Sequence, residues 1–368
     1  MKRKSRILLK TVLFILLALL LIVGGYVAYV FLSYSRLPDK LAIEVGNNGG
    51  ALQETVPTDT ELSLISFNIG FAAYTPDFGF FMDGGSESRA FSEAAVKENL
   101  AAIISWLKGE SADFYMLDEV DVKATRSYGV NEAAAITESF PDYTNAYAEN
   151  WDSAYLFYPL TKPTGASETG LVTLSRYALT SVLRRSLPKD TGIMKIVDLD
   201  RCYSVSRIPT ADGKELVLYT FHLSAYSSGA GIGNSQLEML LQDMKAEYEA
   251  GNYVIGGGDF NKDLLGDSSV YWGVSGGDLS WTAAFPTEVL EDTGISLVAP
   301  LDTDNPVPSC RNADGPADTE GQLRITVDGF LVSENVTVTS SAVADTGFAY
   351  SDHNPVKLTF VLGENESR

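Results

Sequence analysis

Histidine is nearly absent from this chain, with only His222 and His353 among 368 residues. Each lies in a short polar cluster, residues 220–224 (Thr-Phe-His-Leu-Ser) and residues 351–355 (Ser-Asp-His-Asn-Pro). Histidine exchanges protons near neutral pH because its unperturbed pKa is about 6.5. A chain that uses imidazole so sparingly, and sets both rings beside hydroxyls, amides or a carboxylate, is expected to use them for chemistry.

Cysteine is equally scarce, with only Cys202 and Cys310. Catalytic zinc sites take ligands from histidine and cysteine as well as from carboxylates, so the shortage of both makes a zinc enzyme unattractive. The two thiols could form a disulfide in an oxidising compartment, but the sequence does not show whether their Cα atoms lie close enough. Two inert thiols are the alternative.

Basic residues are few beyond the N-terminus. Residues 1–40 hold seven of the 27 Lys and Arg and one of the 48 Asp and Glu, so the remainder has 20 basic and 47 acidic residues, a formal net charge of −27. Tight non-specific binding to nucleic acid depends on Lys and Arg that neutralise phosphates, so this charge disfavours it. A phosphate substrate held through metal ions is still possible.

The N-terminus has the pattern of a membrane anchor. Residues 1–10 form a basic tail, and residues 11–32 form an uncharged apolar run long enough to cross a bilayer core, which needs roughly 20 residues. A cleavable signal peptide is the alternative, although its apolar core is usually shorter. The excess of basic residues before the run predicts a single-pass protein of the cell membrane, with a cytoplasmic N-terminus and an extracytoplasmic remainder.

The remainder is predicted to contain one large domain. Residues 33–60 are polar and turn-rich and are predicted to be a linker, residues 61–362 the domain, and residues 363–368 a short tail. Within the domain, apolar runs of strand length alternate with helical stretches, such as residues 92–107 with Ser92 as N-cap. This alternation predicts an α/β or α+β fold in which helices cover the sheets.

Several apolar runs of strand length end in a polar residue. In sheets flanked by helices, ligands bind outside the strand ends, so these side chains are expected to gather at one rim. The set is rich in oxygen, which suits a hard cation such as Mg²⁺. Its members along the chain are Asn68, Glu119, His222, Asp259, Asn261, Asp328, Asp352 and His353.

In this order, the motifs resemble those of the endonuclease/exonuclease/phosphatase superfamily, which has the deoxyribonuclease-I-like fold. No motif is specific alone, but all occur in sequence and account for both histidines. They are Ser66-Phe-Asn-Ile69, Leu117-Asp-Glu-Val-Asp121, Gly170-Leu-Val-Thr-Leu-Ser-Arg-Tyr177, Phe221-His-Leu223, Gly258-Asp-Phe-Asn261, Thr326-Val-Asp-Gly-Phe-Leu331 and Ser351-Asp-His-Asn-Pro-Val356. The resemblance implies a four-layer sandwich of two packed mixed β-sheets flanked by helices.

The resemblance also implies a metal site. Glu119, with Asn68 nearby and Asp352 as a further ligand, would hold Mg²⁺, for which Mn²⁺ is a possible substitute. One departure is Asp118, because the family commonly has glutamine before the metal-binding glutamate. A second carboxylate there is expected to shift the affinity for the metal or to cap a turn.

The remaining roles follow from phosphate-ester chemistry, in which water must be aligned and the leaving oxygen protonated. Asp259 would orient or deprotonate the water, with Asn261 holding Asp259 and a phosphate oxygen. His222 and His353 would donate hydrogen bonds to the phosphoryl group, and one could act as general acid. Asp328 would orient a histidine, but the sequence leaves open which one.

Three arginines are weaker candidates for contacts with substrate, because a guanidinium suits phosphate oxygens. Arg126 and Arg311 lie in predicted loops, where solvated charge is the alternative, and Arg176 is otherwise a salt-bridged strand residue. The aromatic segment 71–82 follows Asn68 and is expected at the mouth of the pocket, where it would touch substrate or lipid, or pack as a lid on the domain.

Together these features predict a membrane-anchored, monomeric, Mg²⁺-dependent phosphoesterase that acts on a phosphodiester or a phosphomonoester. A lipid head group, a small phosphoester and a nucleic acid all remain open as substrates, because fold alone does not choose among them. The alternative from another class is a non-catalytic surface module that keeps the fold and binds a partner.

Overall fold

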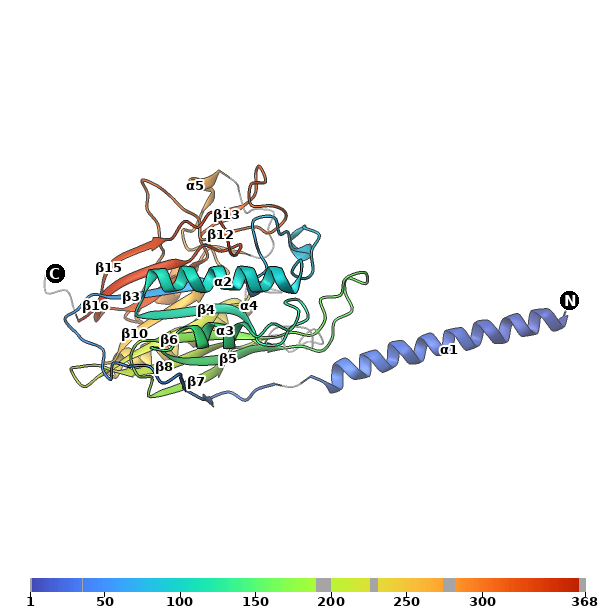
Figure 1. The fold of residues 1–368 in the computed structure, drawn as a ribbon, viewed down its shortest axis with the longest axis horizontal. Coiled ribbons are helices and arrows are strands. Elements are labelled where there is room, and N and C mark those ends of the chain that lie inside the picture. Colours follow the sequence, from blue (N-terminus) through green and yellow to red (C-terminus); the bar gives the residue numbers. More distant parts are fainter. Residues whose placement is uncertain (1, 35, 190–199, 226–230, 274–281, 364–368) are drawn as a thin grey trace.

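The computed structural model describes residues 2–34, 36–189, 200–225, 231–273 and 282–363. Helix α1 (Lys2–Leu32) projects from a body of stacked sheets and surface helices (Figure 1). It is long and apolar enough to cross a membrane, and its apolar side chains are largely exposed. A signal sequence near the N-terminus has the same properties, so the helix is compatible with either an anchor or a leader.

Two seven-stranded mixed sheets form the body. The sheet that we call the β9–β10 sheet has the order β1 (Leu41–Ile43), β7 (Ser181–Ser186), β8 (Cys202–Pro209), β9 (Glu215–His222), β10 (Tyr253–Asp259), β14 (Asp328–Ser333), β11 (Ile295–Val298). The β3–β4 sheet has the order β15 (Val336–Val343), β16 (Val356–Leu362), β3 (Leu62–Asn68), β4 (Phe114–Asp121), β6 (Glu168–Ser175), β5 (Thr144–Asp152), β2 (Gly46–Asn47). One central pair of each sheet is parallel, β9 with β10 and β3 with β4.

Apolar side chains fill the space between the two sheets, with Leu64, Phe114 and Met116 from one sheet and Leu218 and Ile255 from the other. Helices α2 (Glu93–Glu110) and α3 (Glu132–Ser139) pack on the outer face of the β3–β4 sheet, and α4 (Gly231–Glu249) packs on the outer face of the β9–β10 sheet. The central strands are therefore buried on both faces, which explains their nearly continuous apolar runs. The predicted four-layer sandwich is confirmed.

Smaller elements complete the chain. Helix α2 begins as predicted, because the Ser92 hydroxyl accepts a hydrogen bond from the Ala95 N–H at 3.1 Å. The remaining elements of the described residues are η1 (Gly70–Ala72), η2 (Phe81–Asp83), α5 (Ser269–Trp272), η5 (Thr287–Leu290), β12 (Cys310–Arg311) and β13 (Arg324–Ile325). The predicted tail 363–368 lies outside the described residues except for Gly363.

The predicted linker 33–60 is wrong from Leu41 onward, because its second half belongs to the sheets. Leu41 is opposite Arg184 in the pairing of β1 with β7, and β2 pairs with β5. Val56 is fully buried, and its N–H donates to the carbonyl of Pro209 at 2.8 Å. Strands of two or three residues at a sheet edge leave almost no period in a sequence, so the turn-rich composition hid them.

Candidate active site

The ends of the central strands bring the polar residues together. Parallel pairing places Asn68 at the end of β3 beside the end of β4, and His222 at the end of β9 directly opposite Asp259 at the end of β10. Strand β14 runs in the opposite direction and begins at this rim, so Asp328 is also opposite Asp259. The predicted rim therefore forms because neighbouring strands end or begin there.

Asp352 and His353 reach the same rim from the loop before β16. The backbone of Arg311 donates to the carbonyl of Asp352 at 2.9 Å, and Cys310 forms a backbone bridge with His353. The Cys310 Sγ atom lies 3.5 Å from His353 Nε2. Cys202 and Cys310 are both buried, free thiols, so the two cysteines do not pair.

Asp259 is the centre of the cluster. Its Oδ1 atom accepts the backbone N–H of Asn261 at 2.8 Å, and its Oδ2 atom accepts the side-chain amide of Asn68 at 3.2 Å. The same Oδ2 atom lies 3.3 Å from Nε2 of His222 and 3.8 Å from Nε2 of His353. Burial, together with the charge of Asp328, raises the pKa of Asp259 to about 7 even though the charge of His353 opposes this. A carboxyl group with this pKa can both bind and release a proton near neutral pH.

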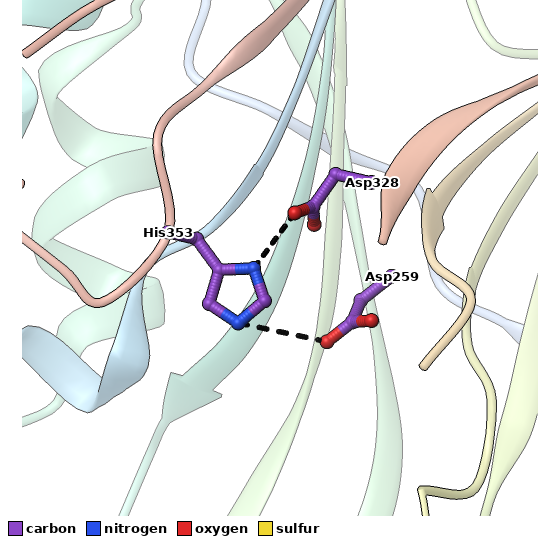
Figure 2. A group of neighbouring side chains, drawn as sticks. All are labelled: Asp259, Asp328 and His353. Carbon is purple, nitrogen blue, oxygen red and sulfur yellow. Dashed lines mark hydrogen bonds and ion pairs between the residues drawn. The ribbon is translucent and has the colours of Figure 1, made fainter. Parts of the chain in front are cut away.

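His353 forms an ion pair with Asp328 (Figure 2). Its Nδ1 atom lies 2.8 Å from Asp328 Oδ2, which also accepts the Ser309 hydroxyl at 2.8 Å. Burial disfavours the imidazolium, but the carboxylate of Asp328 outweighs this effect and raises the pKa of His353 well above its usual value. The structure therefore identifies His353 as the histidine that Asp328 orients, and the ring carries a proton at neutral pH.

His222 has the opposite charge state. Burial lowers its pKa well below the usual value, and the charges of Arg201 and His353 lower it further. Its Nδ1 atom is buried and has no hydrogen-bond partner among the described residues. A neutral imidazole thus lies on one side of Asp259 and an imidazolium on the other, which is the separation of protonation states that acid–base chemistry needs.

Glu119 lies at an irregularity in β4. The pairing of β4 with β6 shifts register between Leu117 and Val120, and Glu119 has a φ of 54°. A bulge of this kind adds a residue and redirects its side chain, and a left-handed glutamate is strained enough to require support from its surroundings. The Nη1 atom of Arg126 lies 3.9 Å from Oε2 of Glu119, and the Asn68 amide nitrogen lies 3.5 Å from its Oε1.

The residues at this position fit a divalent cation. Burial raises the pKa of Asp352, and the charge of Glu119 raises it further. The charges of His353 and Arg311 oppose this rise. Two carboxylates that repel each other beside a polar rim form the oxygen-rich donor set that Mg²⁺ prefers. The group Asp259, Asp328 and His353 also has three potential ligand atoms within 4.8 Å of one another, but the ion pair already uses Asp328 and His353.

Two asparagines are placed differently from the prediction. The side-chain oxygen of Asn68 accepts the Gly70 N–H at 3.1 Å, so its amide nitrogen, not its oxygen, faces Glu119 and Asp259. Asn261 holds Asp259 through its backbone, while its side chain donates to the carbonyl of Leu223 at 2.8 Å. Both residues thus position the carboxylates through N–H groups.

The three arginines have different environments. Arg126 donates to Asp121 through Nε and Nη2 and lies over the Phe71 ring, 3.9 Å from its centroid, beside the cluster. Arg176 is not brought to the rim. It follows Ser175, which pairs with the first residue of β4, and it donates to Ser111 and Tyr143 at the opposite end of the sheet.

Arg311 is fully buried behind the cluster. Its guanidinium donates to the carbonyls of Gly315 at 3.0 Å and Phe78 at 3.3 Å. Its charge lowers the pKa of Asp352 against the effect of burial. It therefore braces the loops around Asp352 from inside the domain.

The aromatic segment after Asn68 is mostly a packed lid. Phe71 and Phe78 are fully buried, and Tyr74 lies between them with its ring centroid 5.2 Å and 4.8 Å from theirs. Burial, then the charges of Asp352 and Asp83, raise the pKa of Tyr74 well above its usual value. Burial and the charges of Asp352 and Glu119 also raise the pKa of Asp83 to about 7. The sequence did not predict Tyr74 or Asp83 as part of this site. The available signal was that Tyr74 lies in the aromatic segment 71–82 and that Asp83 directly follows it.

Asp118 connects the two sheets beneath the site. Its Oδ2 atom accepts the backbone N–H of Asp259 at 3.1 Å, whereas its buried Oδ1 atom has no partner among the described residues. Burial and the charges of Asp259 and Asp328 raise its pKa well above the usual value.

Replacement of Asp118 by Asn is expected to stabilise the fold at alkaline pH. Because the folded-state pKa of Asp118 exceeds the unfolded value, the folded chain binds more protons, and stability falls as the pH rises above about 4 through the folded pKa. The amide keeps the acceptor for Asp259 and cannot ionise, so the free energy of unfolding at pH 8 should rise by on the order of 1 kcal/mol or more. Urea unfolding in EDTA at pH 5 and pH 8 measures this; equal pH slopes in both proteins would contradict it.

The sequence model of the "Endonuclease/Exonuclease/phosphatase family" matches residues 65–353. The chain belongs to this family. No curated protein matches the chain.

Among solved structures, an endonuclease/exonuclease/phosphatase from Beutenbergia cavernae DSM 12333 is 15% identical, with a TM-score of 0.55 over 82% of this chain and 72% of that one. ANGEL2, a 2′,3′-cyclic phosphatase solved with adenosine-2′,3′-vanadate, is 16% identical, with a TM-score of 0.55 over 88% of this chain and 99% of that one. The catalytic domain of human Nocturnin, solved with a sulfate anion, is 16% identical, with a TM-score of 0.53 over 87% and 97%. At 15–16% identity, these structural neighbours establish the fold of this endonuclease/exonuclease/phosphatase family member, and no more.

Proposed function

We propose that this chain is a membrane-anchored, extracytoplasmic phosphoesterase that hydrolyses a phosphodiester or a phosphomonoester by in-line attack of water, with Mg²⁺ as its metal and Mn²⁺ as a substitute. The observation that carries the proposal is the carboxyl group of Asp259 between a neutral His222 and a protonated His353, beside the carboxylates of Glu119 and Asp352. Acid, base and cation-binding oxygens are the three requirements of phosphate-ester hydrolysis.

Glu119 and Asp352 would hold the metal, with Asn68 and Arg126 keeping the Glu119 side chain in place. When bound, the ion would neutralise phosphate oxygens that otherwise repel the attacking water. The residues that brace Glu119 matter because its strained backbone alone does not fix the direction of its carboxylate.

Proton transfer is assigned to the residues around Asp259. Asp259 would accept the proton of the attacking water, held for this by the N–H groups of Asn68 and Asn261. His353 carries a proton on Nε2 that it can donate to the leaving oxygen, and Asp328 keeps that ring charged and oriented. The Nδ1 atom of His222 would bond to a phosphoryl oxygen when it carries the imidazole proton.

The setting of the site supports the remaining parts of the proposal. The first turns of helix α1 carry the basic residues that precede its apolar stretch, which favours a cytoplasmic N-terminus and a catalytic domain outside the membrane. The net charge of −27 beyond residue 40 disfavours tight non-specific binding to nucleic acid. The membrane anchor favours a lipid head group or a small phosphoester outside the membrane. We also propose that the protein is a monomer.

Replacement of Glu119 by Gln tests the metal-dependent reaction. The full chain in detergent should hydrolyse bis(p-nitrophenyl) phosphate or p-nitrophenyl phosphate with Mg²⁺ or Mn²⁺ and lose this activity in EDTA. The variant should lose on the order of 10²–10³-fold in kcat/KM, since a metal supplies several kcal/mol of charge stabilisation, and should need more Mg²⁺ for half-maximal rate.

The matched control is Glu138→Gln, on the exposed surface of α3, which should behave as wild type. If neither ester is hydrolysed with either metal, the enzymatic proposal fails and the non-catalytic binding module takes its place. Activity that survives EDTA would contradict the dependence on a metal but not the phosphoesterase activity.

A further inference from the structure

Large apolar side chains are exposed at a hairpin on the rim of the domain. The chain between β5 and β6 forms this hairpin, whose arms pair through Leu156 and Gly165 with N–H···O distances of 3.1 Å and 3.0 Å. Four exposed side chains gather there, and we call them the apolar tip. They are Phe157 (52% exposed), Tyr158 (70%), Leu160 (85%) and, from the neighbouring η2, Met82 (61%). Single exposed apolar residues are ordinary, but a group of them marks an interaction surface.

The hairpin is fastened to the loop that borders the active site. The ring centroids of Tyr158 and Phe81 lie 5.7 Å apart, and Lys162 forms an ion pair with Glu87. Strand β6, which follows the hairpin, begins beside the end of β4, because Thr169 pairs with Asp121, two residues after Glu119. The apolar tip and the candidate active site therefore lie on the same rim.

The hairpin also contacts the last turns of α1. The Tyr26 hydroxyl donates to the carbonyl of Tyr155 at 3.1 Å, the N–H of Tyr155 donates to the Tyr29 hydroxyl at 3.1 Å, and the rings of Tyr26 and Phe157 pack edge to face at 5.2 Å. Figure 1 shows the β5–β6 connection, in green, reaching out on the side where α1 leaves the domain. Tyrosines near the end of a spanning helix lie at the membrane–water interface.

The short connection between α1 and β1 limits the distance of the domain from the membrane. Only residues 33–40 separate α1 from β1, so the first sheet strand begins within about 32 Å of the helix end even if this segment is fully extended. A hairpin that touches Tyr26 and Tyr29 is then at the level of the bilayer surface whenever α1 spans the bilayer. Its exposed residues, two of them aromatic rings with polar neighbours, are of the kind that lie at this boundary.

We propose that the apolar tip inserts into the interface of the bilayer that α1 spans, so that the active site opens toward lipid head groups and its substrate is the phosphoester of a membrane lipid. This inference rests on the anchor and on the phosphoesterase activity proposed above. The acidic charge of the domain gives it no attraction to anionic lipid, so the insertion is apolar in origin and insensitive to salt.

The depth of the tip tests the docking directly. The full chain is reconstituted in phosphatidylcholine vesicles with a bimane label on Leu160→Cys or, as the matched control, on Ala211→Cys, which is exposed in the β8–β9 turn at the opposite end of the sheet. Burial raises the pKa values of the native Cys202 and Cys310 thiols to about 12, so these react poorly with the label. Spin-labelled lipid should quench more than half of the emission at position 160 and little at position 211, in low and high salt alike.

Equal quenching at both positions would overturn the docking. So would emission at position 160 that changes with protein density and not with spin-labelled lipid, because a second copy of the chain would then cover the tip. Neither result depends on catalysis. Failure of the docking can therefore be distinguished from failure of the proposed activity.

The substrate is tested with a variant of the tip, Phe157→Ser with Leu160→Asp. Vesicles containing sphingomyelin, phosphatidylinositol or phosphatidylglycerol are compared with bis(p-nitrophenyl) phosphate in solution. We expect hydrolysis of at least one lipid, reduced by roughly 10-fold or more in the variant, the scale set by removal of a large apolar side chain from the interface. Hydrolysis of the soluble ester should be unchanged. An enzyme that hydrolyses the soluble ester but no lipid would overturn the lipid substrate and leave the phosphoesterase standing.

Discussion

Replacement of Asp259 by Asn is expected to lower kcat/KM for any phosphoester by about 10²–10⁴-fold, the range for loss of a positioned general base. Among the residues that the structure describes, Asp259 is the one carboxyl group that contacts both imidazoles, and its pKa of about 7 suits transfer of a proton from water. An amide of the same shape keeps an oxygen for the Asn261 N–H but has no site for the proton.

The same replacement should not weaken the fold. The Asp259 carboxyl group is buried, and the charge of Asp328 raises its pKa further, so ionisation of Asp259 costs stability above the unfolded pKa. Removal of this charge offsets the imperfect contact between the new amide and Asn68 or His222. A melting temperature at or above that of the wild type, together with the loss of activity, would show that the Asp259 carboxylate serves catalysis and not stability.

Steady-state kinetics with bis(p-nitrophenyl) phosphate and thermal melts followed by circular dichroism measure the two effects. Asp142→Asn is the matched control, because Asp142 is exposed in the turn before β5. Activity within tenfold of the wild type would contradict the role of Asp259. A large fall in melting temperature would instead show that the carboxylate supports the fold.

The place of the site could be predicted because it depends on strand direction. Asn68, His222 and Asp259 each end a strand, and side chains at the ends of parallel neighbours must meet. Sequence order then places Asp328 at the beginning of the antiparallel neighbour of β10. Pattern and connection rules are local, so they are visible without coordinates.

Features of the site that depend on side-chain packing could not be predicted from the sequence. Arg176 ends an apolar run, as Asn68 does, but its strand β6 runs antiparallel to β4, which takes it to the opposite end of the sheet. The guanidinium of Arg126 is held by Asp121 and faces Glu119, a geometry that depends on how the chain turns back after β4. The opposite charge states of the histidines likewise follow from burial and from one neighbouring carboxylate, not from the residues beside them in the chain.

Replacement of Asp328 by Asn is expected to reverse the protonation of His353 at neutral pH. With the carboxylate gone, burial is the main influence and lowers the pKa of His353 below its usual value. Without a protonated ring to supply the leaving group, turnover at pH 8 should fall by about 10²-fold or more. Ser309→Ala, which removes one hydrogen bond to Asp328, should move the pKa in the same direction by much less.

The contribution of His353 to the free energy of unfolding should depend on pH with opposite slopes in the wild type and in Asp328→Asn. In the wild type the folded pKa of His353 is raised, so its ion pair stabilises the fold fully below pH ~6.5 and loses this effect as the pH rises through the folded pKa. In Asp328→Asn the folded pKa lies below the unfolded value, so this group's contribution to stability should increase from pH 5 to pH 7. Urea unfolding across this range measures the slopes, and equal slopes in both proteins would contradict the pair.

The scarcity of histidine makes the protonation states directly measurable. With only His222 and His353 in the chain, nitrogen-15 spectra of the imidazoles contain two sets of signals, and His222→Gln assigns them. In the wild type, one ring should stay neutral through pH 7 while the other releases its proton above pH ~6.5. Asp328→Asn should shift the second titration to lower pH and leave the first ring neutral. A shift of both rings would mean that Asp328 acts on the site as a whole, and a shift of neither would mean that the ion pair does not set the charge of His353.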